Sequence, residues 1–364
     1  MLVCKDWNQI TTPFLYEHIR LDDRHRADQL LRTLSRKSGG RLASLILRLD
    51  LVIEQLTWEC GHSTEALTPN DEWSNAARIC FAVPNLTTLV MASTNEGERR
   101  IADIVSPCLR HICFLHTFTL SISDWVAFMD KHPVLESADP PRLRDDKNHS
   151  GSVIATSGKR WPSIKELIFH IALDIDKWAR WFLRGAFPNL HRVVIRTSIE
   201  PHEEEVFSNF LCLHGSNLET IELTDGYESG AQSSIPDRLF PILSEYCPKL
   251  NHVVWTISDM DDLVRWENSR GCHTEPINDR QLPGITSFTL QTLEPPESVV
   301  VDALYHWVRC LPSVRKIVML EADLDILRAD YSNSLQTFVS WLHDIGRNRG
   351  IKIELEDEYG IQVR

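Results

Sequence analysis

Two cysteines and two histidines lie close enough in the sequence to be considered as metal ligands: Cys108, His111, Cys113 and His116. Thiolate and imidazole are preferred zinc ligands, and a structural zinc site needs four of them in a tetrahedron. On a strand, however, His111 and Cys113 share one face, whereas His116 falls on the other. The spacing also matches no standard zinc finger. We therefore predict buried thiols, surface imidazoles and no metal site.

The remaining polar clusters offer no set of catalytic side chains. Residues 202–205 read His-Glu-Glu-Glu, which suits the acidic first turn of a helix, where negative charge offsets the helix dipole. The sequence has no Gly-rich phosphate loop, no H-E-x-x-H helix and, at residues 61–65, no strand-to-helix nucleophile elbow. We expect no catalytic residues and no cofactor, and we expect that the protein is not an enzyme.

Composition limits the class of protein. The chain has 364 residues, 43% of them hydrophobic and 24% charged, which predicts a folded protein of about two domains unless it is a repeat array. A net charge of −13 without a basic run argues against nucleic acid as a partner. No apolar stretch approaches the roughly 18 residues of a membrane span. Nine scattered cysteines and no hydrophobic leader predict a cytoplasmic or nuclear location.

A short apolar pattern recurs along the chain and predicts its architecture. Each copy has one apolar residue, two variable residues, an apolar residue, one variable residue and a third apolar residue. The copies lie at 41–49, 84–92, 162–170, 188–196, 216–224, 248–256, 283–291 and 312–320, with weaker ones at 115–123 and 132–140. Segments with helical spacing lie between them, at 174–186, 203–213, 235–247, 298–311 and 334–346. Strand and helix therefore alternate, which predicts an α/β fold.

This recurring pattern, from about residue 40 to 360, resembles leucine-rich repeats. The resemblance implies an irregular solenoid, a horseshoe with parallel strands on its concave side and helices on its convex side, in which each repeat buries its apolar face against its neighbours. Small or hydroxylated residues mostly replace the usual Asn or Cys after each strand, so we expect uneven curvature. An ordinary doubly wound α/β domain with irregular connections is the alternative that the residues leave open.

The first 21 residues predict two short helices. Leu2, Val3 and Trp7 follow an apolar face of the first helix, and Thr12 would cap a second helix that carries Leu15. This stretch resembles the end of an F-box and its junction with the repeat domain in fungal F-box proteins.

The resemblance implies an F-box remnant over 1–22 and a degenerate leucine-rich-repeat domain over 23–364. Within the second domain, the polar and turn-rich composition predicts a mobile loop at 139–160. F-box proteins dock on a Skp-type adaptor of a cullin-RING ubiquitin ligase, while their repeats capture the substrate. By this resemblance, Leu2, Val3, Trp7 and Leu15 are a remnant of the adaptor-binding surface. The docking half of the box would precede Met1, so we expect adaptor binding only with the full F-box.

The strand copies also predict a binding surface. The middle residue of each copy points away from the helices, and most of these residues are aliphatic, Ile46 in the first copy among them. We predict an exposed apolar groove with charged edges that binds a protein substrate. It is lined by Ile168, His170, Arg192, Val194, Arg196, Glu222, His252, Val254 and Val318. Two alternatives stay open, because strands covered on both sides read as aliphatic runs and Val and Ile suit strands in general.

Three functions follow as hypotheses. The leading one is a non-catalytic protein-binding module that serves as the substrate-recognition subunit of an SCF-type ubiquitin ligase. The second is a repeat scaffold for protein–protein contact without coupling to ubiquitination. The third is a hydrolase with a site in an inter-repeat loop, which would need a convergent acid, base and nucleophile that the sequence does not display.

Overall fold

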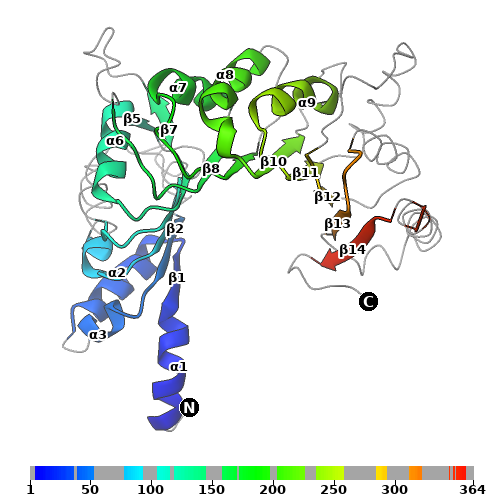
Figure 1. The fold of residues 1–364 in the computed structure, drawn as a ribbon. Coiled ribbons are helices and arrows are strands. Elements are labelled where there is room, and N and C mark those ends of the chain that lie inside the picture. Colours follow the sequence, from blue (N-terminus) through cyan, green and yellow to red (C-terminus); the bar gives the residue numbers. More distant parts are fainter. Residues whose placement is uncertain are drawn as a thin grey trace, which may run out of the picture. The chain divides into compact units, whose positions relative to one another are not determined.

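A computed structural model gives the fold of the chain (Figure 1). The structure describes residues 5–36, 39–52, 78–92, 105–114, 119–144, 158–169, 172–196, 203–225, 235–257, 284–292, 311–321, 344, 347–348 and 350–357. The chain divides into two compact units, unit 1 (residues 1–167) and unit 2 (residues 168–364), and each is taken by itself below. Both units are mixed α/β, and their described strands pair in parallel in a linear order, which confirms the predicted α/β class with parallel strands and excludes a closed barrel of these strands.

Unit 1 begins with helix α1 (Lys5–Glu17), strand β1 (His18–Leu21), helices α2 (Arg24–Leu34) and α3 (Gly39–Ala43) and strand β2 (Arg48–Val52). The parallel sheet continues with β3 (Thr88–Ala92), β4 (His111–Phe114), β6 (Ser137–Asp139) and β8 (Glu166–Phe169), whose last two residues belong to unit 2. Strands β5 (Thr119–Ser121) and β7 (Arg142–Arg144) form a separate parallel pair, and helix α6 (Ile122–Lys131) follows β5 directly.

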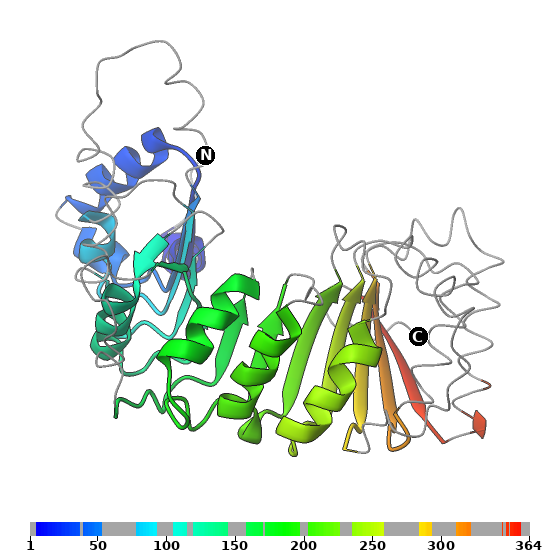
Figure 2. The same cartoon turned by 90° about the horizontal axis from the view of Figure 1, so that it is seen from above.

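Unit 2 continues with α7 (Ala172–Trp181), β9 (Arg192–Ile195), α8 (Glu204–His214), a 3-10 turn η5 (Gly215–Asn217), β10 (Thr220–Asp225), α9 (Ile235–Tyr246) and β11 (His252–Ile257). Strands β12 (Ser287–Thr292), β13 (Lys316–Glu321) and β14 (Lys352–Asp357) complete it. Each strand from β9 to β14 pairs in parallel with the next, and Figure 2 shows these strands side by side with helices along one face.

A recurring turn explains the apolar pattern of the sequence. The first apolar residue of a copy donates its N–H to the carbonyl three residues earlier and so closes a turn before the strand; this holds at Leu109, Leu135, Ile164, Leu190, Leu218, Leu250 and Val314. The backbone carbonyl of the residue just before one strand then accepts two N–H groups from the residues that begin the next strand. The His191 carbonyl before β9, for example, accepts from Glu219 (2.9 Å) and Thr220 (3.0 Å) at the start of β10. The same backbone geometry thus begins strand after strand.

Side chains support these turns from one copy to the next. The amide of Asn217 donates to the Pro188 carbonyl (2.9 Å), and the hydroxyl of Ser163 donates to the Pro133 carbonyl (2.5 Å). Asn85 does the same toward an earlier turn. These bonds lie where strands begin, whereas leucine-rich repeats carry their Asn after the strand. In this chain, polar side chains at the starts of strands therefore donate hydrogen bonds to the turn carbonyls, and the sequence pattern did not predict them.

The helices of unit 2 cover one face of its sheet with aromatic side chains. The ring of Phe169 on β8 packs edge-on against Trp178 of α7 and Phe210 of α8, with centroids 5.6 and 5.4 Å apart. Ile195 of β9 and Leu223 of β10 occupy the position that corresponds to Phe169, and both are buried. Two residues earlier, the register aligns a second buried row across five strands: Val193, Ile221, Val253, Phe288 and Ile317. These rows form the core of unit 2.

Aromatic side chains of a strand and a helix also pack together in the core of unit 1. Phe114 of β4 packs edge-on against Trp125 and Phe128 of α6, and the latter two rings stack with centroids 5.3 Å apart. His132 stacks on Phe128 in turn and is itself buried. Each large aromatic side chain between sheet and helix buries a large apolar area, and this burial stabilises strands of only three or four residues.

The first predicted copy, 41–49, is out of register by four residues. Residues 39–43 form helix α3, and the strand lies at Arg48–Val52. Ile46 is therefore the first apolar residue of the copy and is fully buried, not a groove residue, and Asp50 takes the predicted place of Ile46. A further copy that begins at Leu109 and forms β4 was not predicted.

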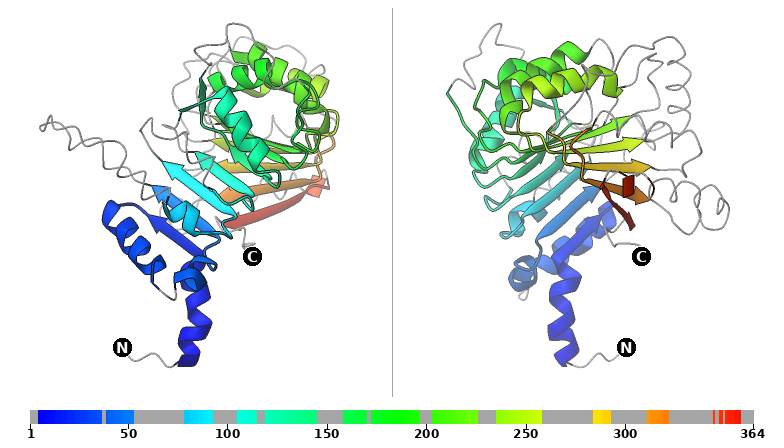
Figure 3. Two further views of the ribbon diagram at one scale, coloured as in Figure 1. Left: turned by 90° about the vertical axis from the view of Figure 1, so that its left-hand side faces the viewer. Right: turned by 45° about the vertical axis from the view of Figure 1, so that its right-hand side comes forward.

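The opening segment also differs from prediction. Residues Lys5–Glu17 form one helix that continues through Thr12 and Pro13, where two short helices were expected. The next residues form β1, which pairs in parallel with β2, so the predicted boundary after residue 22 falls inside a continuous sheet. Figure 3 shows α1 extending from the start of β1, away from the strands of unit 1.

Part of the predicted mobile loop at 139–160 belongs to strands. Asp139 ends β6, and Arg142–Arg144 form β7 against β5. Residues 145–157 lie outside the described residues, and the chain resumes at residue 158. Four of the first six residues of the predicted loop, Asp139 and Arg142–Arg144, thus lie in strands, and β7 finds its partner strand more than 20 residues earlier in the chain.

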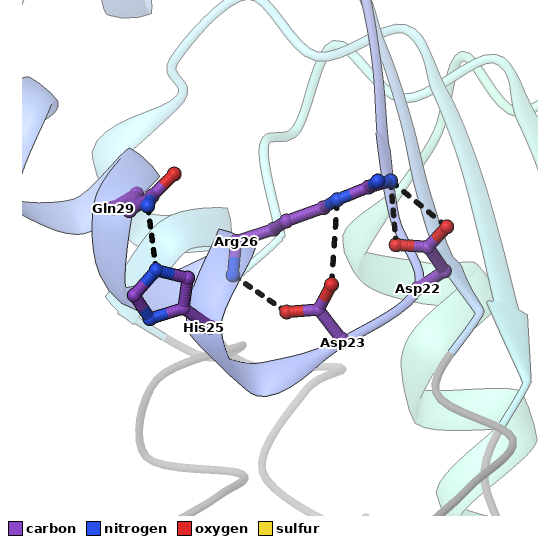
Figure 4. A network of polar contacts seen from close by, with 5 residues as sticks. All are labelled: Asp22, Asp23, His25, Arg26 and Gln29. Atoms are coloured by element: carbon purple, nitrogen blue, oxygen red, sulfur yellow. Dashed lines mark hydrogen bonds and ion pairs between the residues drawn. The ribbon is translucent and has the colours of Figure 1, made fainter.

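A compact polar network fixes the start of α2 (Figure 4). Asp23 is the N-cap, and its carboxylate accepts the Arg26 N–H at 2.8 Å. The Arg26 guanidinium donates to both carboxylate oxygens of Asp22 (2.8 and 2.9 Å), and His25 and Gln29 form a 2.7 Å hydrogen bond one turn on. Helix capping accounts for these groups, since an N-cap carboxylate satisfies N–H groups that have no partner inside the helix.

Among the helices described here, no segment combines the length and the apolar character that crossing a bilayer requires.

Candidate functional site

The face of the unit 2 sheet opposite the helices is the candidate site, and we call it the helix-free face. It carries every second residue of strands β9 to β14, because side chains alternate between the two faces of a sheet. The register places Arg192, Thr220, His252, Ser287, Lys316 and Lys352 in one row, and Val194, Glu222, Val254, Thr289, Val318 and Glu354 in the next. Figures 1 and 2 show helices α7, α8 and α9 on the other side.

The predicted residues Arg192, Val194, Glu222, His252, Val254 and Val318 thus share one face, as expected from the sequence. Ile168 lies in β8, where alternation puts it opposite the helix-packed Phe169, and Arg196 directly follows β9 and is exposed. His170 lies outside the described residues.

Polar side chains cross this face in a repeated diagonal arrangement. The Arg192 guanidinium donates to the Glu222 carboxylate at 2.7 Å, and Glu222 is the register partner of Val194, two residues after Arg192. His252 and Thr289 make the same diagonal beside Val254, with a 2.8 Å hydrogen bond.

The third diagonal lies beside Val318. The Lys316 ammonium is 2.6 Å from the Glu354 carboxylate, which is the register partner of Val318, and Lys352 forms a second ion pair with Glu354. A polar pair therefore passes beside each of the three valines of this face. We call these three contacts the diagonal pairs.

The valines are buried, which corrects the predicted exposed apolar groove. Val194, Val254 and Val318 keep only 2, 8 and 5% of their surface exposed, and Ile168, the fourth aliphatic residue of the predicted groove, is half-buried. Neighbouring strands lie about 4.8 Å apart, so the longer arginine, lysine, histidine and glutamate side chains beside a valine extend past it. Solvent meets polar groups on this face where the sequence predicted an apolar groove.

The charged groups of the face differ in how far they are exposed. The carboxylate side chains of Glu222 and Glu354 are 16 and 6% exposed, whereas the side chains of Arg192, Lys316 and Lys352 are 42, 42 and 69% exposed. The hydrogen bonds from Lys316 and then Lys352 lower the pKa of Glu354, so this carboxylate stays ionised.

His252 lies between the two charged ends of the face. Burial lowers its pKa, and the nearby Arg192 and Lys316 charges lower it further, while Glu222 opposes them. The lowered pKa favours the neutral imidazole at neutral pH. The centre of the face is thus uncharged, and charge is presented toward its two sides.

Lys352 and Glu354 belong to the face but were not predicted, whereas Thr289 is the middle residue of the copy at 283–291 and lies on the predicted face. The copy that contains β14 was missed because Gly350 stands where the register of β13 and β14 would put the first apolar residue. The alternation Lys-Ile-Glu-Leu-Glu at 352–356 was the available signal, since alternate apolar and polar residues predict a strand with one covered face.

The predicted adaptor-binding residues are only partly described. Leu2 and Val3 lie outside the described residues, and Trp7 is in α1 with a side chain that the structure does not describe. Leu15 is 68% exposed and its neighbour Phe14 is 73% exposed, both on α1. Two large apolar side chains are thus open to solvent on this helix.

Three of the four possible zinc ligands, Cys108, His111 and Cys113, lie among the described residues. Cys108 and His111 are exposed, and the Cys113 thiol donates to the Asp139 carboxylate at 3.1 Å. His116 lies outside the described residues, and no group of three or more metal-ligating side chains occurs among the residues that the structure describes.

Unit 1 carries a smaller polar cluster on its own sheet. The Asp50 carboxylate accepts hydrogen bonds from His18 (2.8 Å) and Arg48 (2.9 Å). Burial raises the pKa of Asp50, but the hydrogen bonds and charges of Arg48 and His18 outweigh it, so the pKa is lowered overall. The cluster is an ion pair that compensates a buried carboxylate, and it contains no nucleophile.

Comparison with known proteins adds little to this geometry. No family model matches the chain, and no curated protein matches it. Among solved structures, the chain is similar to a Bacteroides fragilis protein determined as a structural genomics target, at 14% identity and a TM-score of 0.35, over 77% of this chain and 69% of that one.

Proposed function

We propose that this chain is a non-catalytic protein-binding protein that holds its partner on the helix-free face of unit 2. The observation that carries the proposal is a broad sheet face, from β9 to β14, that no described helix covers and that presents exposed polar and charged side chains. A surface with charged groups around a buried apolar row resembles the mixed composition of protein–protein interfaces. The described residues assemble no nucleophile, base and acid.

We further propose that the fold is an irregular leucine-rich-repeat horseshoe and that the chain serves as a substrate-recognition subunit of an SCF-type ubiquitin ligase. The recurring turn and parallel strand support the repeat part of this proposal. The exposed Phe14 and Leu15 on α1 support an apolar contact at the N-terminal end, where an F-box remnant would meet a Skp-type adaptor.

A photo-crosslinking experiment tests partner binding. A photoreactive phenylalanine analogue is placed at Ser287, in the centre of the helix-free face, and as a matched control at Arg180 on α7. Illumination in extract of the source cells, followed by mass spectrometry, should give protein adducts that depend on Ser287 and are absent at Arg180. Equal labelling from both positions would contradict the proposal.

Co-purification distinguishes the two forms of the function. The chain with its full upstream sequence is expressed together with a Skp-type adaptor. Retention of the adaptor, and its loss on Phe14→Ser with Leu15→Ser, would support the ubiquitin-ligase subunit. A chain that captures partners through Ser287 but never retains the adaptor would be the repeat scaffold, and substrate turnover that requires a loop residue would indicate the hydrolase.

A further inference from the structure

The helix-free face presents positive charge to solvent although its ionic groups are nearly balanced. Two of its carboxylates, Glu222 and Glu354, are largely buried, and each accepts a hydrogen bond from a more exposed cation, while a third, Glu356, falls in the next row of the face. The cations Arg192, Lys316 and Lys352 keep 42 to 69% of their side chains exposed. An ammonium or guanidinium has several N–H donors, and the exposed part of each cation lets a second anion approach it beside the carboxylate that it already binds.

This local sign is opposite to that of the chain as a whole, whose net charge is −13. A partner that meets a positive face on a negative protein gains from charge complementarity at this face and is repelled elsewhere, which favours one docking position. Resting on the proposed function, we propose that the partner of the helix-free face is an acidic protein segment in extended conformation, whose carboxylates bind Arg192 on one side and Lys316 with Lys352 on the other.

The strand spacing sets the spacing of these carboxylates. Arg192 lies on β9 and Lys316 on β13, four strands along the sheet, which at about 4.8 Å per strand is about 19 Å. An extended segment advances about 3.3 Å per residue, so two acidic residues about six positions apart span this distance. An even separation also places both side chains on the same side of the segment. His252 and Thr289 between the cations offer neutral hydrogen-bonding groups to its middle.

Nucleic acid fits this arrangement less well than an acidic peptide. A nucleic-acid strand carries one negative charge for each nucleotide, and the phosphates between those bound at Arg192 and Lys316 would lie over the Glu222 carboxylate of the intervening strand β10. A peptide can place neutral residues at those points. The alternation of cation and carboxylate across the face therefore favours a partner with sparse, spaced negative charges.

The test uses fluorescein-labelled peptides and the full chain. One peptide has two glutamates six positions apart in a Ser/Thr/Val background; its controls have glutamine at both positions, or lysine at both. We expect the glutamate peptide to bind about 4- to 25-fold more tightly than the glutamine peptide by fluorescence anisotropy, since each of its two exposed ion pairs contributes a factor of about two to five. Binding should be weaker at high salt, because salt screens these pairs.

Three variants locate the effect. Arg192→Gln with Lys316→Gln should weaken the glutamate peptide about tenfold, and Lys352→Gln, which leaves Glu354 paired with Lys316, should weaken it about two- to fivefold without loss of fold. Lys249→Gln, in the turn before β11, removes the same charge away from the face and should change nothing. Circular dichroism of each variant checks the fold, and the Lys352 variant remains decisive if the double variant unfolds.

Each other outcome has a defined meaning. Equal binding of the glutamate and glutamine peptides, or equal weakening by Lys249→Gln, would overturn the acidic specificity, as would tighter binding of a single-stranded oligonucleotide of matched charge. No binding by any peptide would also overturn it. The Ser287 crosslink reports partner binding whatever the charge of the partner. Crosslinking without a preference for the glutamate peptide would therefore contradict the acidic specificity and still support the proposed function.

Discussion

Protonation of a buried histidine should set the acid limit of stability of unit 2. His214, at the end of α8, is 4% exposed; its Nε2 lies 3.2 Å from the Phe182 carbonyl oxygen, and the rings of Phe210 and Phe187 lie 5.1 and 5.4 Å away. Burial lowers its pKa from 6.5 to about 4, against the opposing effect of the hydrogen bond to Phe182. The native fold thus favours the neutral ring.

The magnitude follows from this shift. A pKa that is lower in the folded than in the unfolded chain gives stability that is present above about pH 6.5 and is lost as the pH falls toward 4. The full shift corresponds to about 3.4 kcal/mol, of which about 2 kcal/mol is lost between about pH 7.5 and pH 5.

Urea unfolding of the wild-type chain and of His214→Gln across this pH range measures the effect. The glutamine variant should be less stable near pH 7.5, because it loses packing, and the gap should narrow by about 2 kcal/mol at about pH 5. Other groups titrate in both proteins and cancel in the difference. His191→Gln, at an exposed histidine, is the matched control. A stability gap that does not change with pH would refute the reasoning.

Three further predictions concern stability, measured by urea unfolding. Leu218→Ala should destabilise by about 2 to 5 kcal/mol, because Leu218 is fully buried in the core; an effect near zero would mean that its side chain is not in the core. Val194→Glu should destabilise by more than about 2 kcal/mol, whereas Arg196→Glu at an exposed neighbour should have little effect, and tolerance of both would mean that the diagonal pairs do not cover the valine. Gly215→Ala should destabilise by about 1 to 3 kcal/mol, because an added Cβ would lie 2.9 Å from a cysteine sulfur and from a backbone oxygen, whereas Gly40→Ala in open space should be neutral or stabilising.

The sequence predicted most of the strand positions and the side chains that share a face. Periodicity placed β3 and β8 to β13, and the register aligned Val194, Glu222 and Val254 as expected. The predicted register of the first copy was wrong because residues 41–52 contain two overlapping apolar triplets, one beginning at Leu42 and one at Ile46. Pairing of β2 with β1 selects the second triplet, and a pattern within one segment cannot report that pairing.

The candidate site was predicted less well than the strands that carry it. A side chain's face follows from its own strand, but its exposure depends on the side chains of the two neighbouring strands, about 30 residues away in sequence. Val194 and Val318 are buried because their register partners Glu222 and Glu354 form ion pairs with Arg192 and Lys316, and the long side chains of these pairs cover the valines.

The amino-acid sequence by itself therefore determined the alternation of strand and helix and the two faces of each strand, because these follow from local spacing. Only the tertiary structure decided the register of the first copy, the burial of the valines and the sign of the charge on the helix-free face. These depend on which residues of separate strands stand side by side, and parallel pairing brings together residues that the sequence holds far apart.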